Sequence, residues 1–207
     1  MPVTAFGQLT IRYDDRVLTP REWTARQSEW AAALAGQAPG GDILELCSGA
    51  GHIGLLALAL VHQADDQRRL VCVDVNPASA ELTTINAEAA GLAPFVEVRV
   101  ADLLEAVTPD ERFPLIIADP PWVLRAEIGR YPDDPLLAID GGDDGLDVAR
   151  RCLEVIGGHL PPGGTGVLQL GYAEQVSALA GALEANRLEV VEVRAEERGV
   201  LVLLQNR

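Results

Sequence analysis

From Asp42 onward, short apolar runs alternate with segments of helical periodicity, and this alternation constrains the fold more than any other feature. The predicted strands are 43–47, 70–73, 95–100, 115–118 and 166–170, and the predicted helices are 53–61, 78–90, 146–157 and 173–186. Strands that alternate with helices form a parallel sheet covered on both faces, because each short connection is a right-handed crossover. The sequence therefore predicts an α/β fold.

The last two predicted strands, 189–194 and 200–204, are separated only by residues 195–199. So short a connection can join only antiparallel neighbours. We therefore expect a seven-stranded, mostly parallel sheet with one reversed strand at or near an edge. Further upstream, 9–13 and 17–18 predict a hairpin around Asp14-Asp15, and 22–36 predict a helix. We interpret residues 1–40 as a small hairpin and helix cap on a core of residues 41–207, within one domain.

Composition and charge restrict the class of protein. The chain has 207 residues, of which 48% are hydrophobic and 23% charged, as in a globular protein with one sizeable core. It contains neither a bilayer-spanning apolar run nor an export signal, so we expect a cytoplasmic protein without membrane contact. Its 16 arginines are set against 31 acidic residues, and the net charge of −15 makes nucleic acid a less favoured partner. Cys47, Cys72 and Cys152 are too widely spaced for a disulfide framework or a zinc site, and we expect small core residues.

The segment 45–54, ELCSGAGHIG, follows the first predicted core strand and opens a helix, where glycines let the main chain approach a ligand closely. Gly49, Gly51 and Gly54 satisfy the GxGxxG pattern of dinucleotide-binding enzymes. Glu45 argues against a dinucleotide, because a carboxylate there repels a pyrophosphate but favours the ammonium and sulfonium groups of S-adenosylmethionine. His52 has no nucleophile or metal-ligand partner at a suitable spacing, and we interpret it as a packing or surface residue.

Acidic residues also end the next two predicted strands. Asp74 is placed to accept hydrogen bonds from ribose hydroxyls, and Asp102 to accept one from an adenine amino group. Each carboxylate alone is more typical of a helix cap or a solvated loop. Because the carboxyl ends of parallel strands lie along one crevice, these residues together with Asp119 predict one cofactor site.

The tetrapeptide Asp119-Pro120-Pro121-Trp122 follows the apolar run 113–118. The nitrogen of an amide or a base amine is a poor nucleophile, because its lone pair is delocalised. An acceptor side chain at Asp119 and the C=O of Pro120 can each take one N–H bond, so that the lone pair points outward. Trp122 supplies a flat apolar face, and the prolines stiffen the strand exit. The plainer alternative is an ordinary strand-to-loop turn.

In this order, the motifs resemble those of class I S-adenosylmethionine-dependent methyltransferases that modify a planar nitrogen, and within them the release-factor glutamine N5-methyltransferase group. The resemblance extends from about Val17 to the C-terminus. The segment 17–24 is similar to the one that lines the cofactor and substrate pocket in that group, and 137–147 is similar to a segment that the group carries after the tetrapeptide. It implies a single Rossmann-like domain with S-adenosyl-L-methionine as cofactor. Cys47 stands where a glycine is usual, Asp119 replaces the common Asn, and Trp122 replaces the common Tyr. The family's separate N-terminal helical domain is not recognised.

The resemblance implies three sets of site residues. The cofactor-binding set is Glu45, Cys47, Ser48, Gly49, Gly51, Asp74, Val75, Asp102, Leu103 and Asp119. The catalytic set is Asp119, Pro120, Pro121 and Trp122, and the substrate-binding set is Arg21, Thr24, Trp122 and Tyr131. No metal is expected, because residues 140–145 lack the alternating ligands of a calcium loop. The long segment 123–139 is expected to be a substrate lid.

The sequence therefore predicts an enzyme that methylates a planar amide or amino nitrogen of a protein glutamine or a small molecule. One alternative is methylation of adenine N6 or guanine N2 in nucleic acid, because Asp and Trp also occur in the tetrapeptide of adenine-N6 methyltransferases. A non-catalytic cofactor-binding protein is another, although the intact tetrapeptide argues against it. A nicotinamide dehydrogenase would need the glycine turn without Glu45. The sequence indicates no particular oligomeric state.

Overall fold

The computed structural model describes residues 1–64 and 66–207, and its centre is a seven-stranded sheet in the order β5-β4-β3-β6-β7-β9-β8. The strands are β3 (Ile43–Leu46), β4 (Leu70–Asp74), β5 (Val96–Val100), β6 (Leu115–Ala118), β7 (Thr165–Leu170), β8 (Leu188–Ala195) and β9 (Val200–Asn206). Neighbours in the sheet are parallel except at β9, which runs antiparallel to both β7 and β8. The predicted sheet with one reversed strand near an edge is confirmed.

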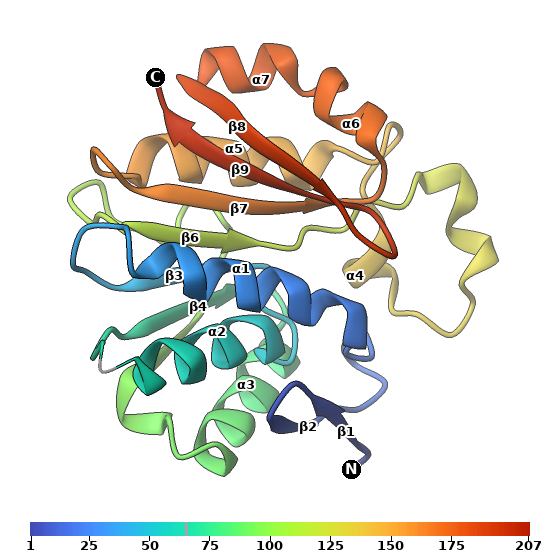
Figure 1. Cartoon of the computed structure of the whole chain (residues 1–207). Helices are drawn as coiled ribbons and strands as arrows, with labels where there is room; N and C mark the ends of the chain where they lie inside the picture. The colour runs from blue at the N-terminus through green and yellow to red at the C-terminus, as the bar shows by residue number, and fades with distance from the viewer. Residues whose placement is uncertain (65) are drawn as a thin grey trace.

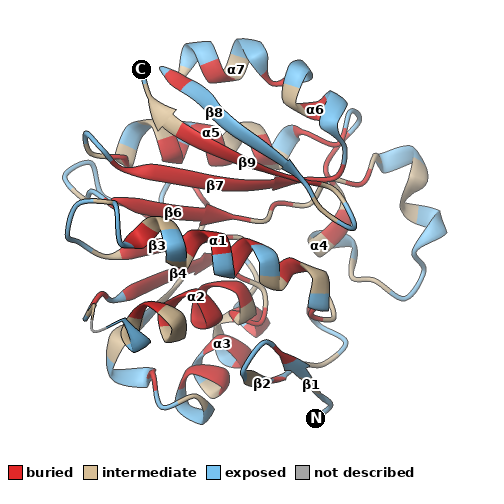
Figure 2. Ribbon diagram, in the orientation of Figure 1, coloured by how far each residue is buried: buried red, intermediate tan, exposed pale blue. Residues whose placement is uncertain are grey.

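Helices cover both faces of the sheet (Figure 1). On one face lie α1 (Ala25–Ala35), α2 (His52–Gln63) and α3 (Pro77–Ala89), and on the other lie α5 (Asp147–His159), α6 (Ala173–Ala178) and α7 (Ala180–Ala185). Figure 2 shows the buried residues concentrated on the central strands and on the inner sides of these helices. In β3, Leu44 and Leu46 belong to one core and Ile43 to the other. Successive side chains of a strand point to opposite faces, which is why the central strands are mainly apolar.

The N-terminal hairpin differs from the predicted one. It consists of β1 (Val3–Phe6) and β2 (Leu9–Arg12), which pair antiparallel across Gly7 and Gln8. The prediction of a hairpin around Asp14-Asp15 is therefore wrong, because the partner of the 9–12 strand precedes it. Gly7 has a φ of 55°, which suits the tight turn. The Asp14 side chain instead accepts a hydrogen bond from the main-chain N–H of Arg16 at 3.0 Å, forming a local turn.

Two further segments position the site. The segment 123–139 contains the 3-10 helix η3 (Arg125–Arg130) and the short helix α4 (Leu136–Ile139), and it projects from one end of the sheet (Figure 1). Its base is closed by hydrogen bonds from Val123 N to Ile139 O at 3.0 Å and from Gly141 N to Val123 O at 2.9 Å. The 3-10 helix η1 (Glu22–Thr24) leads into α1, and η2 (Ala93–Phe95) precedes β5.

The predicted helix over 173–186 is present as two helices, α6 and α7, which meet at the buried Leu179. Over the described part of the chain, none of the helices has the length and apolar character that crossing a membrane requires.

Candidate active site

Two cavities meet where the chain leaves β6. The first has a volume of about 220 Å³ and the second about 290 Å³. Five residues line both cavities, and these are Leu18, His52, Asp119, Pro121 and Ala138. Only His52 and Asp119 among them carry polar side chains. His52 and Asp119 are therefore the polar side chains at the junction of the two cavities.

The first cavity lies across the carboxyl ends of β3, β4, β5 and β6. The Asp74 carboxylate accepts hydrogen bonds from Gly49 N at 2.8 Å and Asn76 N at 2.9 Å. These bonds aim the carboxylate, and its remaining lone pairs are available to ligand hydroxyls. Burial raises the pKa of Asp74 above its usual range. Asp102 pairs with Arg151 of α5, whose hydrogen bond holds the pKa of Asp102 below its usual range.

Most of the predicted cofactor residues line this cavity: Cys47, Gly49, Asp74, Val75, Asp102, Leu103 and Asp119. Glu45, Ser48 and Gly51 are not part of its wall. The buried Glu45 carboxylate accepts a hydrogen bond from Gly54 N at 2.8 Å and one from Cys72 Sγ at 3.3 Å. Glu45 therefore ties the first turn of α2 to the sheet, and its predicted contact with a cofactor stays a prediction. Burial raises the pKa of Glu45 to about 7.

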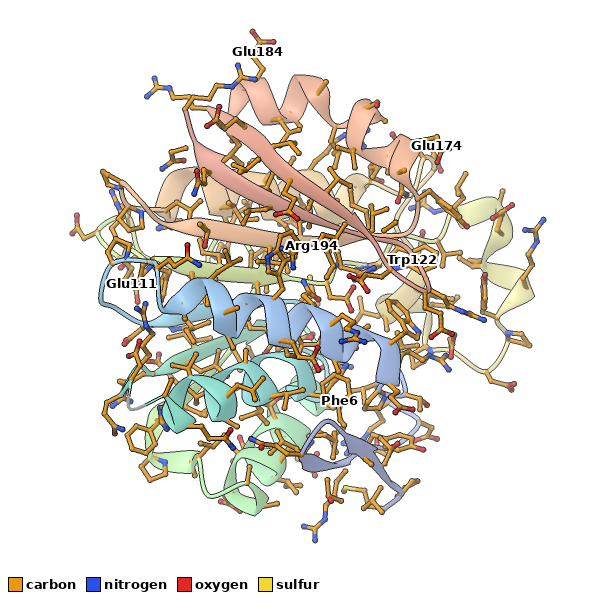
Figure 3. All side chains as sticks on the ribbon, in the orientation of Figure 1. Phe6, Glu111, Trp122, Glu174, Glu184 and Arg194 are labelled. Atoms are coloured by element: carbon orange, nitrogen blue, oxygen red, sulfur yellow. The ribbon has the colours of Figure 1, made fainter. Side chains whose placement is uncertain are left out.

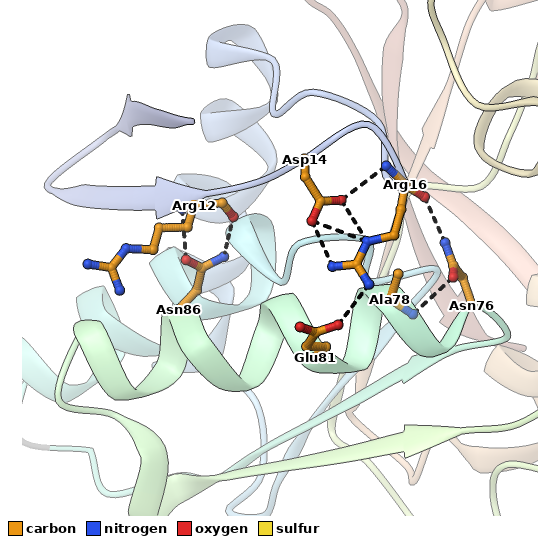
Figure 4. Close-up of polar contacts among 7 residues, drawn as sticks. All are labelled: Arg12, Asp14, Arg16, Asn76, Ala78, Glu81 and Asn86. Carbon is orange, nitrogen blue, oxygen red and sulfur yellow. Dashed lines mark hydrogen bonds and ion pairs between the residues drawn. The ribbon is translucent and has the colours of Figure 1, made fainter. Parts of the chain in front are cut away.

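The N-terminal segment completes the first cavity through residues 16–18, and polar contacts fix it to α3 (Figure 4). Asn86 accepts a hydrogen bond from Arg12 N at 2.8 Å and donates one to Arg12 O at 2.9 Å. The Arg16 guanidinium pairs with Glu81 of α3 at 2.8 Å. The resemblance placed the segment 17–24 at the cofactor and substrate pocket, and Val17 and Leu18 do line the first cavity. Sequence patterns did not predict the contacts with α3, because these join residues that are distant along the chain.

The four predicted substrate-binding residues, Arg21, Thr24, Trp122 and Tyr131, all line the second cavity. Arg21 pairs with Asp134 at 3.0 Å, and Thr24 Oγ1 donates a hydrogen bond to Arg21 O at 2.8 Å. The segment 123–139, predicted to be a lid, contributes five residues of this wall: Val123, Tyr131, Asp134, Ala138 and Ile139. It therefore forms one side of the second cavity.

Trp122 lies at the same end of the molecule as the tip of the β8–β9 hairpin (Figure 3). Its ring meets Tyr172 edge to face, with centroids 5.7 Å apart and planes at 82°. Trp23 and Arg198 line the same cavity. Trp23 belongs to the segment 17–24 that the resemblance placed at the pocket, whereas sequence reasoning missed Arg198. Arg198 lies on the hairpin tip, where its carbonyl accepts a hydrogen bond from Gln169 Nε2 at 3.4 Å. Arg198 reaches the cavity only because β9 returns to the sheet, and no local sequence motif predicts such a contact.

The two polar residues at the junction of the cavities have different charge states. Burial raises the pKa of Asp119 to about 7, so it is ionised above neutral pH. His52 begins α2, and its ring packs edge to face on Phe6 with centroids 4.8 Å apart. Burial lowers the pKa of His52 to about 4, so the imidazole is neutral at pH 7. The interpretation of His52 as a packing residue fits the Phe6 contact but missed its place in both cavities.

The three cysteines were expected to be small core residues, and two of them are buried. Cys72 and Cys152 are buried and free, and Cys47 is a half-buried free cysteine with a φ of 59°. Across residues 1–64 and 66–207, no group of three or more His, Cys, Asp or Glu side chains is arranged to hold a metal ion.

Comparisons with known proteins identify the family to which the chain belongs. Residues 31–130 match the methyltransferase small domain. The release factor glutamine methyltransferase of Moorella thermoacetica is 32% identical over 192 residues, which cover 90% of this chain and 66% of that protein. The ribosomal protein uL3 glutamine methyltransferase of Bordetella pertussis is 35% identical over 135 residues, covering 62% of this chain and 43% of that protein.

The chain spans about half the length of several of the curated relatives that it matches. Among solved structures, the ribosomal protein L11 methylase of Lactobacillus delbrueckii subsp. bulgaricus has a TM-score of 0.68 at 17% identity, covering 95% of this chain and 85% of that one. That similarity shows the Rossmann-like methyltransferase fold. Together these matches establish that the chain belongs to the class I methyltransferases and is similar to the glutamine methyltransferases of release factors and of ribosomal protein uL3.

Proposed function

We propose that this protein transfers a methyl group from S-adenosylmethionine to the side-chain amide nitrogen of a protein glutamine. One observation carries the proposal. A cavity lined by Asp74 and Asp102 meets, at Asp119, a second cavity lined by the rest of the tetrapeptide. The relatives named as glutamine methyltransferases support the choice of acceptor.

The chemistry of the first cavity suits this cofactor. Asp74 would accept from the ribose hydroxyls and Asp102 from the adenine amino group. Gly49 has a φ of 54°, and a Cβ added there would meet nothing within 4 Å, so the loop leaves open space over its main chain. The cofactor would supply a methyl group made electrophilic by its sulfonium charge.

In the second cavity, the chain's own residues would orient the acceptor. The Asp119 carboxylate and the Pro120 carbonyl each accept one N–H bond of the amide, so that the nitrogen lone pair points toward the junction. Trp122 lies against the flat amide. The negative charge of Asp119 would stabilise the positive charge that develops on the nitrogen as the N–C bond forms and the methyl–sulfur bond breaks, which leaves S-adenosylhomocysteine. The same carboxylate can then accept the N–H proton that the methylated nitrogen loses, and most of the acceleration comes from alignment.

The unit that we propose to be catalytic includes the N-terminal cap. Residues 16–18 line the first cavity and residues 18, 19, 21, 23 and 24 line the second, so residues 1–40 and 41–207 build one site. We also propose a cytoplasmic location, because the substrates named for the relatives are release factors and a ribosomal protein.

A methyl-transfer assay tests the acceptor. The protein is incubated with tritiated S-adenosylmethionine and a lysate separated into protein, RNA and small-molecule fractions. We expect label in the protein fraction, and mass spectrometry should locate it on glutamine. Label confined to RNA or to small molecules would overturn the glutamine acceptor. Calorimetry with S-adenosylmethionine and with NAD tests the cofactor, and binding of NAD alone would overturn the whole proposal.

A further inference from the structure

Gln27 connects α1 to the strand that precedes the tetrapeptide. Its side chain is fully buried, and its amide Nε2 donates hydrogen bonds to Ala118 O at 2.9 Å and to Val167 O at 3.0 Å. Ala118 is the last residue of β6 and directly precedes Asp119. One amide group therefore links helix α1 to β6 and β7 at the point where the chain turns toward the site.

The Gln27 side chain has both favourable and unfavourable contributions to stability. The Oε1 atom of Gln27 is buried and has no hydrogen-bond partner within the described part of the chain. A buried polar atom without a partner lowers stability, and this cost offsets part of what the two Nε2 hydrogen bonds contribute. The net contribution of Gln27 to stability is therefore smaller than that of a fully paired buried amide.

Gln27 joins the two elements, α1 and β6, that adjoin two walls of the second cavity. Trp23 and Thr24 immediately precede α1 and line one side of that cavity. The tetrapeptide that follows Ala118 lines another side. Because the Gln27 amide holds the exit of β6 against α1, it sets the spacing between these two walls.

We propose that Gln27 is a positioning residue, whose two hydrogen bonds hold Asp119 and the Pro120 carbonyl in the orientation that the acceptor nitrogen needs. The inference rests on the proposed methyl transfer and adds a residue to it. Gln27 lines neither cavity, so it acts through the main chain of β6. A misplacement of about 1 Å in a reacting group can cost roughly a hundredfold in rate.

The variant Gln27→Met tests this role, because it keeps the side-chain length and removes both hydrogen bonds. We expect only a small change in melting temperature, because removal of the unpartnered Oε1 offsets part of the loss of the two hydrogen bonds, and a dissociation constant for S-adenosylmethionine within about twofold. We expect kcat to fall by about 10- to 100-fold, with a much smaller change in the KM for the acceptor. A kcat within about twofold of the wild type, or a loss of activity that only parallels a loss of stability, would overturn the inference.

Ser28→Ala is the matched control. Ser28 is also fully buried on α1, but its Oγ donates to Ile53 O of α2 at 2.8 Å, away from β6. We expect this variant to melt at a lower temperature and to keep its kcat within about twofold. If Ser28→Ala lowers kcat as much as Gln27→Met does, the effect belongs to helix packing in general and the inference fails.

A titration that needs no acceptor separates this inference from the proposed function. In the wild type, burial raises the pKa of Asp119 to about 7. Carbon-13 NMR of the Asp119 carboxyl in Gln27→Met should show that pKa moved toward its ordinary value, because a displaced β6 exit exposes the side chain to solvent. An unchanged pKa would contradict the role of Gln27 even if no acceptor had been found. A wild type that methylates nothing would overturn only the proposed function.

Discussion

The six-membered ring of Trp122 lies directly on the α-carbon of Gly171. A Cβ built on Gly171 would overlap three atoms of that ring, Cε3, Cδ2 and Cζ3. Main-chain contact with Gly171 and edge-to-face contact with Tyr172 therefore fix the orientation of Trp122 in the second cavity. A residue outside the tetrapeptide thus determines how the Trp122 ring is oriented.

The variant Gly171→Ala should displace Trp122. We expect the KM for the acceptor to rise by about tenfold, because the apolar face moves, while the affinity for S-adenosylmethionine stays within about twofold. Steady-state kinetics and calorimetry measure the two quantities. Gly181→Ala is the control, because a Cβ there meets nothing within 4 Å. An acceptor KM that stays at the wild-type value in Gly171→Ala would show that Trp122 does not contact the acceptor.

Asp119 should make the reaction pH-dependent. The proposed role needs the carboxylate, and burial raises the pKa of Asp119 to about 7. We therefore expect kcat/KM to rise as the pH increases through about 7 and to level off above it. Asp119→Asn keeps an acceptor oxygen without the charge, so it should be slower and should lack this rise. A flat wild-type profile between about pH 5.5 and 8.5 would exclude Asp119 as the controlling group.

Asp119→Ala removes the side-chain acceptor altogether. We expect methyl transfer to be abolished, because the amide nitrogen then loses one of its two orienting hydrogen bonds. The affinity for S-adenosylmethionine should change by no more than a few-fold, and calorimetry checks this. A fully active variant would show that the tetrapeptide acts without Asp119.

The free energy of unfolding should decrease as the pH rises, because the buried Glu45 carboxyl group loses its proton. Its pKa is raised from 4.5 to about 7 by burial, so the folded protein holds this proton more tightly than the unfolded chain does. The free energy of unfolding should therefore decrease from about pH 4.5 to about pH 7 on account of Glu45. In Glu45→Gln this contribution is absent, so the variant should gain stability relative to the wild type as the pH increases. Urea unfolding of both proteins at about pH 5 and pH 8 measures the difference, and a pH-independent difference would contradict the assignment.

Cys47 adopts a backbone conformation that favours glycine. Its φ of 59° costs a residue with a Cβ about 1 kcal/mol or more. Cys47→Gly and Cys47→Ala both remove the sulfur, but only the glycine variant relieves the strain. We expect Cys47→Gly to be more stable than Cys47→Ala by about 1 kcal/mol in urea unfolding. If the alanine variant were equally stable, the strain at this position would be negligible.

Much of the fold was predictable, because the physics that shapes it is local. The alternation of apolar runs and helical periodicity predicted the parallel strands, and the short connection at 195–199 predicted the reversal of β9. The N-terminal hairpin was predicted with the wrong partner, since both Gly7 and Asp14 carry turn chemistry and only tertiary contacts select between them. The break between α6 and α7 falls at Leu179, which carries no helix-breaking signal.

The site was predictable where its residues end parallel strands, since Asp74, Asp102 and Asp119 necessarily meet at one edge of the sheet. Glu45 shows the limit of that argument. Glu45 lies inside β3, in register with Cys72 and Ile117 and not with Asp74 and Asp119, and its carboxylate accepts hydrogen bonds from Gly54 and Cys72. Arg198 joins the site only through the return of the last strand, whereas His52 belongs to the glycine-rich segment 45–54 but was interpreted as a packing or surface residue.

The place of β9 in the sheet has a consequence for the order of folding. This last strand inserts between β7 and β8, so the hairpin tip with Arg198 cannot reach the second cavity until residues 200–206 have been synthesised. The strands whose ends bear Asp74, Asp102 and Asp119 all lie upstream and pair without it. During synthesis the cavity lined by Asp74 and Asp102 can therefore assemble first, and the wall of the second cavity is completed last.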